Sequence, residues 1–143
     1  MIDIENLVFG NVATALRSAF SGVFVSGAYV AAPKTFPAVT LVEVDNSAYA
    51  KSQDSSAAEN HATVVYEVNA YSDVAATKKA QCKAMMAVID SQMRSMGFSR
   101  IGSGPADMPN ADTNVYRMVA RYRGVVAAKT IAGDSTKYQI YRK

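Results

Sequence analysis

The chain contains the segments PAVTLVEV (residues 37–44) and TVVYEVNAY (residues 63–71), followed by ATKKAQCKAMMAVIDSQMRSM (residues 76–96). Alternate positions of the second segment are apolar, which is typical of a β-strand with one face on a core. The third segment has helical periodicity, and its apolar stripe consists of Cys82, Met85, Met86, Ile89, Met93 and Met96. A methionine stripe can be an adaptable binding face, but beside an alternating strand it favours a core.

The flanking sequence adds a helix and further strands to this unit. Residues 3–20 have apolar side chains at spacings of three and four, with Asp3 as the expected N-cap. Residues 23–30 and 114–129 are rich in β-branched and aromatic side chains, which predicts two strands.

Cap and turn residues separate these elements. Ser72 or Asp73 is expected to cap the helix over residues 76–96, and Gly97 is a signal for its C-terminus. After that glycine we expect a short strand and then a turn-rich loop at residues 102–110.

The predicted architecture is α+β: a single-domain two-layer sandwich with an antiparallel or mixed sheet and two helices on one face. The domain spans residues 1–143, with a protruding polar loop or hairpin at 45–62 and a C-terminal hairpin at 124–143. A length of 143 residues, with 50% hydrophobic and 19% charged residues, is typical of one globular domain.

Few residues suit catalysis or metal binding. The chain has one histidine, His61, and one cysteine, Cys82, and the cysteine lies on the predicted buried stripe, where a thiol is inert. Glu43 and Glu67 lie on adjacent predicted strands and could form a carboxylate pair, although charge pairing on a strand face is commoner. We expect no enzymatic activity, no cofactor and no metal site.

The ends and the charge of the chain exclude other classes. The N-terminus is acidic where a signal peptide would be basic, and the longest apolar stretch, residues 22–33, is shorter than the roughly 18 residues of a membrane span. We therefore expect a soluble, unsecreted protein without a membrane partner. The net charge of +3 permits contact with polyanions but is far from that of a dedicated nucleic-acid binder.

Two polar features are candidates for contact with a partner. Residues 45–62 form an insertion that is too long for an ordinary connection, and they are either a protruding hairpin or a loop without a role. Arg117, Arg121 and Arg123 fall on one side of a predicted strand, as a positive stripe about 20 Å long. The stripe is either a solvated face paired with Glu43 and Glu67, or a face for a DNA backbone or an acidic partner.

Short motifs carry a family resemblance along nearly the whole chain. They are FPAV (36–39), ExDNS (43–47), QDSS (53–56), ENHA (59–62), YEVNxYS (66–72), KKxxCK (78–83), GF (97–98) and YRMVxRY (116–122). With these motifs the chain resembles small tailed-phage and prophage proteins of the tail terminator and head–tail joining group. The resemblance implies a structural subunit that forms a ring, usually a hexamer, at the head-proximal end of the tail tube.

This resemblance also implies partners and a location. The ring would end tube polymerisation, contact the tail tube protein and the neck or connector proteins, and let double-stranded DNA pass through its lumen without sequence specificity. The protein would lie in the tail or neck of the virion, and in the host cytoplasm during assembly. Two alternatives remain open: a head completion or stopper protein of the neck, and a small DNA-binding accessory protein.

In a ring of this kind, two sets of residues receive roles. Arg117, Arg121 and Arg123 would form a basic face that lines the lumen or a seam between subunits. An inter-subunit or inter-ring contact loop would be formed by Asp45, Asn46, Tyr49, Lys51, Gln53, Asp54, Glu59 and His61.

Overall fold

The computed structural model describes residues 3–30, 33–48, 61–74, 76–108, 114–130 and 138–141. In chain order the elements are α1 (Glu5–Ala19), β1 (Phe24–Ser26), β2 (Ala38–Ala48), β3 (His61–Ser72), α2 (Lys78–Ser95), β4 (Ser99–Met108), β5 (Tyr116–Thr130) and β6 (Tyr138–Tyr141).

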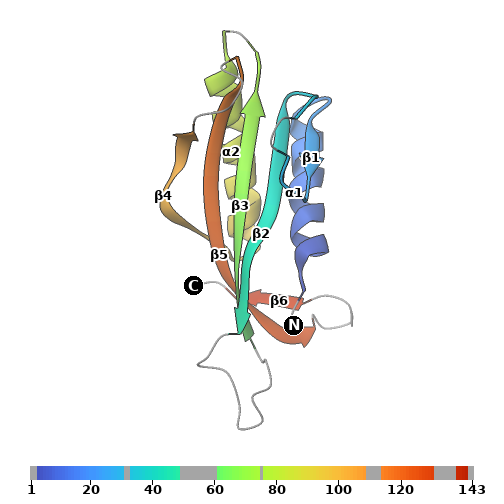
Figure 1. The fold of residues 1–143 in the computed structure, drawn as a ribbon. Coiled ribbons are helices and arrows are strands. Elements are labelled where there is room, and N and C mark those ends of the chain that lie inside the picture. Colours follow the sequence, from blue (N-terminus) through green and yellow to red (C-terminus); the bar gives the residue numbers. More distant parts are fainter. Residues whose placement is uncertain are drawn as a thin grey trace.

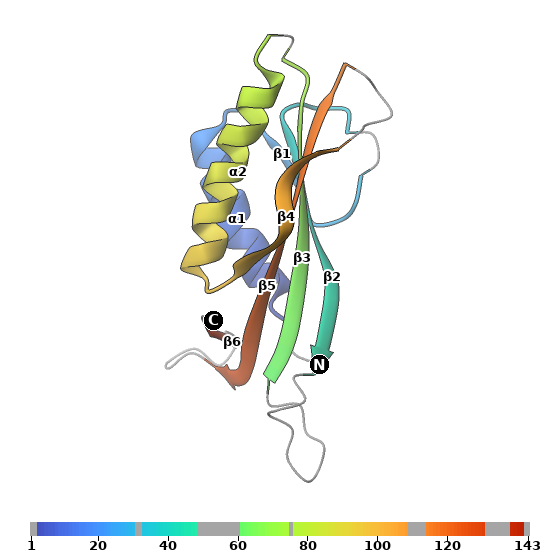
Figure 2. The same ribbon diagram turned by 90° about the vertical axis from the view of Figure 1, so that its left-hand side faces the viewer.

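The strands of the described residues form one mixed sheet. Its order is β1-β2-β3-β5-β4, and β6 pairs with the end of β5. The β1–β2 pair is parallel and the others are antiparallel. Both helices cover the same face (Figures 1 and 2), so the other face, here called the outer face, has no helix on it. The predicted two-layer α+β fold is therefore confirmed, with a mixed sheet.

Helix α2 is a crossover within this sheet. It follows β3 and leads into β4, and these two strands lie on either side of β5. Because β3 and β4 are both antiparallel to β5, they are parallel to each other. A parallel relation needs a long connection, and α2 provides it.

The core lies between the alternating face of β3 and the apolar stripe of α2. On β3, Val64, Tyr66, Val68 and Ala70 are fully buried. They belong to one cluster with the buried stripe residues of α2 and with the apolar face of α1. The prediction that the methionine stripe is core is confirmed. The buried members of that stripe are Cys82, Met85, Met86, Ile89 and Met93.

The predicted glycine cap at the end of α2 is also confirmed. Gly97 has φ +97°, and its N–H donates to the carbonyl of Arg94 at 3.0 Å. The N–H of Phe98 donates to the carbonyl of Met93 at 2.9 Å, which completes a Schellman motif. The buried Phe98 ring then packs edge-on against Tyr66, with ring centroids 5.6 Å apart. The cap thus directs the chain from the helix layer into the sheet.

The prediction of a loop at residues 102–110 is wrong for residues 102–108, and residues 109 and 110 lie outside the described part of the chain. Strand β4 continues to Met108, although its register with β5 jumps from Ile101↔Arg121 to Ala106↔Val119. Gly102, with φ +75°, lies at the start of this irregularity. The turn residues are tolerated because β4 is an edge strand, which needs hydrogen bonds on one side only.

Strand β1 and the helix N-termini also differ from expectation. The strand stops at Ser26, because its hydroxyl accepts the Ala28 N–H and donates to the Ala28 carbonyl, both at 3.1 Å. The N-cap of α1 is Ile4, while Asp3 Oδ1 accepts the Glu5 N–H at 3.0 Å. The N-cap of α2 is Thr77 rather than Ser72 or Asp73, because the Ser72 hydroxyl is hydrogen-bonded to Gln81.

Candidate interaction surfaces

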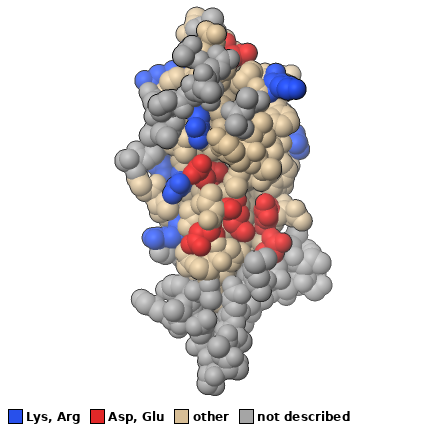
Figure 3. All heavy atoms as spheres, viewed as in Figure 1, with Lys and Arg blue, Asp and Glu red and all other residues tan. Residues whose placement is uncertain are grey.

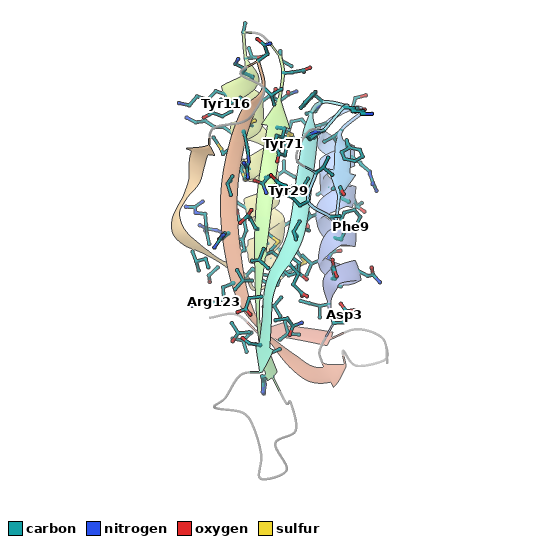
Figure 4. All side chains as sticks on the ribbon, viewed as in Figure 1. Asp3, Phe9, Tyr29, Tyr71, Tyr116 and Arg123 are labelled. Atoms are coloured by element: carbon teal, nitrogen blue, oxygen red, sulfur yellow. The ribbon has the colours of Figure 1, made fainter. Side chains whose placement is uncertain are left out.

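The three arginines of the predicted basic face all lie on the outer face of β5. Side chains of β5 alternate between the two faces of the sheet. Met118, Ala120 and Tyr122, which are neighbours of the arginines along the strand, are buried on the helix side. Arg117 and Arg123 are six residues apart on the strand, which corresponds to about 20 Å. Figure 4 shows Tyr71 near the upper end of this face and Arg123 near the lower end.

Arg121 is paired with Glu67, which lies directly opposite it on β3. Its Nε and Nη2 atoms donate to Glu67 Oε2 at 3.1 and 2.8 Å. The Arg121 side chain is still 57% exposed, so the pair contributes at most about 1 kcal/mol to stability. For this arginine the structure agrees with the alternative of a solvated face paired with Glu67.

Arg117 is held by uncharged neighbours. Its Nε donates to Asn69 Oδ1 at 2.9 Å, and its guanidinium lies 5.9 Å from the centroid of the Tyr71 ring. Burial raises the pKa of Tyr71, and the Arg117 charge opposes this shift. Tyr71 also belongs to a second apolar cluster with Ala38 and Val115, on which Phe36 packs. The upper part of the outer face is therefore covered by its own chain.

Arg123 has a third environment. It lies opposite Val65 on β3 and opposite Ser99 on β4. Its Nε atom is buried, and within the part of the chain that the structure describes it has no hydrogen-bond partner. The three arginines therefore do not form one uniform positive stripe.

Glu43 and Glu67 point to opposite faces of the sheet, so the hypothesis of a carboxylate pair is wrong. Glu67 is opposite Val42, whereas Glu43 is opposite Tyr66 and lies on the helix side. The Tyr66 hydroxyl donates to Glu43 Oε1 at 3.2 Å. Burial raises the pKa of Glu43, the Tyr66 hydrogen bond opposes this, and the charges of Glu5 and Asp3 add to it. The same alternative paired Glu43 with the arginines, and the described residues show no such pair, because Glu43 lies on the helix side and the arginines on the outer face.

Cys82 and His61 are at opposite ends of the sheet. The Cys82 thiol is buried and lies 3.6 Å from the carbonyl oxygen of Ala70. Ala70 is nine residues further along β3 than His61, which corresponds to roughly 30 Å. A nucleophile–base pair of these two residues is therefore excluded by distance.

Only some residues of the predicted contact loop belong to the part of the chain that the structure describes. Asp45 and Asn46 belong to β2, and His61 begins β3, so the two strands extend into the predicted insertion and pair as far as Ala48↔Ala62. The remaining candidates lie outside the described residues: Tyr49, Lys51, Gln53, Asp54 and Glu59. Residues 131–137, which connect the two strands of the predicted C-terminal hairpin, lie outside them as well.

Two local features were not predicted from the sequence. A register shift between Glu43 and Asp45 makes a β-bulge at Val44. On the other side of the molecule, a groove of about 310 Å³ lies between α2 and the β4–β5 edge. The bulge depends on the register between strands, and the groove depends on how the helix packs on the sheet. The periodicity of residues in the sequence predicts neither.

Within the residues that the structure describes, no group of three or more His, Cys, Asp or Glu side chains could hold a metal ion. None of the helices in the same part of the chain is both long and apolar enough to cross a membrane. Comparison with protein-family models and with curated protein sequences gives no match.

Proposed function

We propose that the chain is a structural subunit of a phage tail terminator ring. Such a ring lies at the head-proximal end of the tail tube, ends tube polymerisation and joins the tail to the neck. The observation that carries the proposal is the shape of the subunit. Strands β2, β3 and β5 run past the ends of both helices (Figures 1 and 2), and the outer face carries no helix.

This shape suits a subunit that is completed by its neighbours. The β2–β3 pair continues to Ala48↔Ala62, so it carries Asp45 and His61 toward the end of the sheet that extends past the helices. Strand β4 is an edge strand of ten residues, and a long edge of this kind is commonly covered by a partner. The shape supports only a general role in assembly. The resemblance of the sequence motifs to tail terminator proteins is the reason for proposing a ring on the tail tube.

Inactivating the gene in the phage or prophage that encodes the chain tests the proposal. We expect tails of uncontrolled length that are not joined to heads, visible by negative-stain electron microscopy, and restoration by a plasmid copy. Tails of normal length beside unjoined heads would instead favour a head completion or stopper protein. Normal, infectious particles without the protein would exclude the tail terminator, head completion and stopper roles.

A second candidate, a small DNA-binding accessory protein, is favoured by the exposure of Arg121 on the same face as Arg123. It predicts duplex DNA binding that weakens with salt, with a log–log slope that falls by about 0.9 for each arginine removed. Fluorescence anisotropy with Arg121→Ala measures this slope, and Arg17→Ala on α1 is the matched control. Negligible binding at about 50 mM salt excludes this candidate.

A further inference from the structure

Acidic and basic side chains gather in different parts of the subunit. The N-terminal end of α1 and the following part of β2 carry Asp3, Glu5, Glu43 and Asp45, whereas Arg17 and Lys34 belong to the C-terminal end of α1 and to the segment before β2. Figure 3 shows carboxylates gathered in the lower half of this view, and Figure 4 places Asp3 on the side opposite Arg123. The side formed by α2 and β4 carries Lys78, Lys79, Lys83, Arg94 and Arg100. Figure 1 shows α1 and β4 at opposite edges of the molecule.

The acidic side presents an apolar side chain. At the bulge between Glu43 and Asp45, Val44 has no partner residue on β3, and its side chain is 47% exposed. In sequence it lies between Glu43, whose half-buried carboxylate accepts the Tyr66 hydroxyl on the helix side, and the exposed Asp45, which pairs opposite Val65. Phe24 and Tyr29, two other large exposed hydrophobic residues, belong to β1 and to the segment that leads from β1 to β2.

The basic side presents a matching groove. Its floor is apolar, with the buried Met86 and Met118 beside Ala87, and its rim carries Lys83 and Arg100. The groove also contains Asp90, whose carboxylate is already engaged. It accepts the Tyr122 hydroxyl at 3.1 Å and pairs with Arg94 at 3.0 Å and Arg100 at 3.4 Å. The groove therefore suits an apolar side chain flanked by negative charge.

We propose that the Val44 bulge of one subunit docks into the α2–β4 groove of a second copy of this chain. The apolar side chain meets the methionine floor, and the exposed carboxylate next to it, Asp45, meets the positive rim at Lys83. Because bulge and groove lie on opposite sides of the subunit, the contact is heterologous, and repetition of it closes a ring or extends a filament. The inference rests on the proposed function, since it assigns the contact between neighbouring subunits of that ring.

Two substitutions separate the two halves of this contact. Val44→Asp removes the apolar side chain, and Ala87→Trp fills the groove from an exposed position of α2. Sedimentation velocity of the wild-type chain over a concentration series should show self-association, and each variant alone should associate at least tenfold more weakly. An equimolar mixture should form a dimer and nothing larger, because one intact bulge meets one intact groove and the other pair is blocked.

Matched controls keep the test decisive. Val74→Asp changes another exposed valine, and Ala84→Trp changes another exposed alanine of α2, and both should associate like the wild type. Circular dichroism establishes that each variant is folded. A wild-type chain that stays monomeric up to about 1 mM overturns the inference. Association that survives both substitutions also overturns it but leaves the ring proposal standing, since the tail phenotype tests that proposal separately.

Discussion

Glu43 makes the stability of the subunit depend on pH. Its pKa is raised in the folded chain, chiefly by burial, with Glu5 and Asp3 adding to the shift. A raised folded pKa means that the stability contributed by the protonated carboxyl is present below the unfolded pKa and is lost as the pH rises through the folded pKa. At neutral pH the ionised Glu43 therefore costs stability.

Glu43→Gln should raise Tm at pH 7, because the amide cannot ionise and still accepts the Tyr66 hydroxyl. The difference from the wild type should disappear below about pH 4, where the wild-type carboxyl is also neutral in both states. Thermal melts by circular dichroism between pH 3 and 8 measure this. Glu67→Gln is the control, and it should not raise Tm, because it loses the pair with Arg121. A Glu43→Gln variant less stable than the wild type at pH 7 would contradict the prediction.

Gly124 is required by the Phe98 ring. A Cβ atom at this position on β5 would lie 2.8 Å from Cδ1 and 2.9 Å from Cε1 of that buried ring. Gly124→Ala should therefore lower the free energy of unfolding by about 1–3 kcal/mol, which urea denaturation can measure. The double variant with Phe98→Leu should recover part of the loss caused by the alanine, measured relative to Phe98→Leu alone. An alanine variant as stable as the wild type would show that the ring moves freely.

Among the elements, those with strong periodicity could be predicted from the sequence. Strand β3 and helix α2 show the expected alternation and stripe because each buries one face against the other. The first residues of β4 were predicted as a short strand, but its continuation to Met108 was not, because pairing with β5 overrides the turn preference of its glycine and proline residues. The outward orientation of the three arginines followed from alternation. The partners of these arginines, such as Asn69 and Tyr71, depend on the register between strands. A single sequence does not allow that register to be predicted.

Two helix glycines, one at the C-terminal cap of α2 and one inside α1, should respond to alanine substitution with opposite changes in stability. Gly97 has φ +97°, so Gly97→Ala should destabilise the chain by about 1–2 kcal/mol. Gly10 lies inside α1, and a Cβ there would meet no neighbouring atom within 4 Å. Gly10→Ala should therefore stabilise by about 0.5–1 kcal/mol, through helix propensity. Chemical denaturation of both variants tests the signs, and equal effects at the two glycines would contradict the assigned roles.

At the scale of the whole molecule, acidic side chains gather at the N-terminal end of α1 and on β2, and basic side chains on α2 and β4. The sheet ends in β1 and β2 on one side and in β4 on the other, and Figure 1 shows α1 and β4 at opposite edges, so the acidic residues of α1 and β2 lie apart from the basic residues of α2 and β4. Neither the net charge of +3 nor the arginine spacing indicates this arrangement. It arises from strand order, and strand order is the part of the fold that local patterns determine least.

Self-association through oppositely charged sides should weaken with salt. Raising the salt from about 50 to about 500 mM shortens the Debye length from more than 10 Å to about 4 Å, which screens the rim charges of the groove. We expect the dissociation constant from sedimentation velocity to rise at least tenfold over this range. Lys83→Gln should reduce that dependence, whereas Arg17→Gln, the same change of charge on an exposed position of α1, should leave it intact. Association that is unchanged or strengthened by salt would mean that apolar contact alone joins the subunits, and the rim charges would then have no part in the contact.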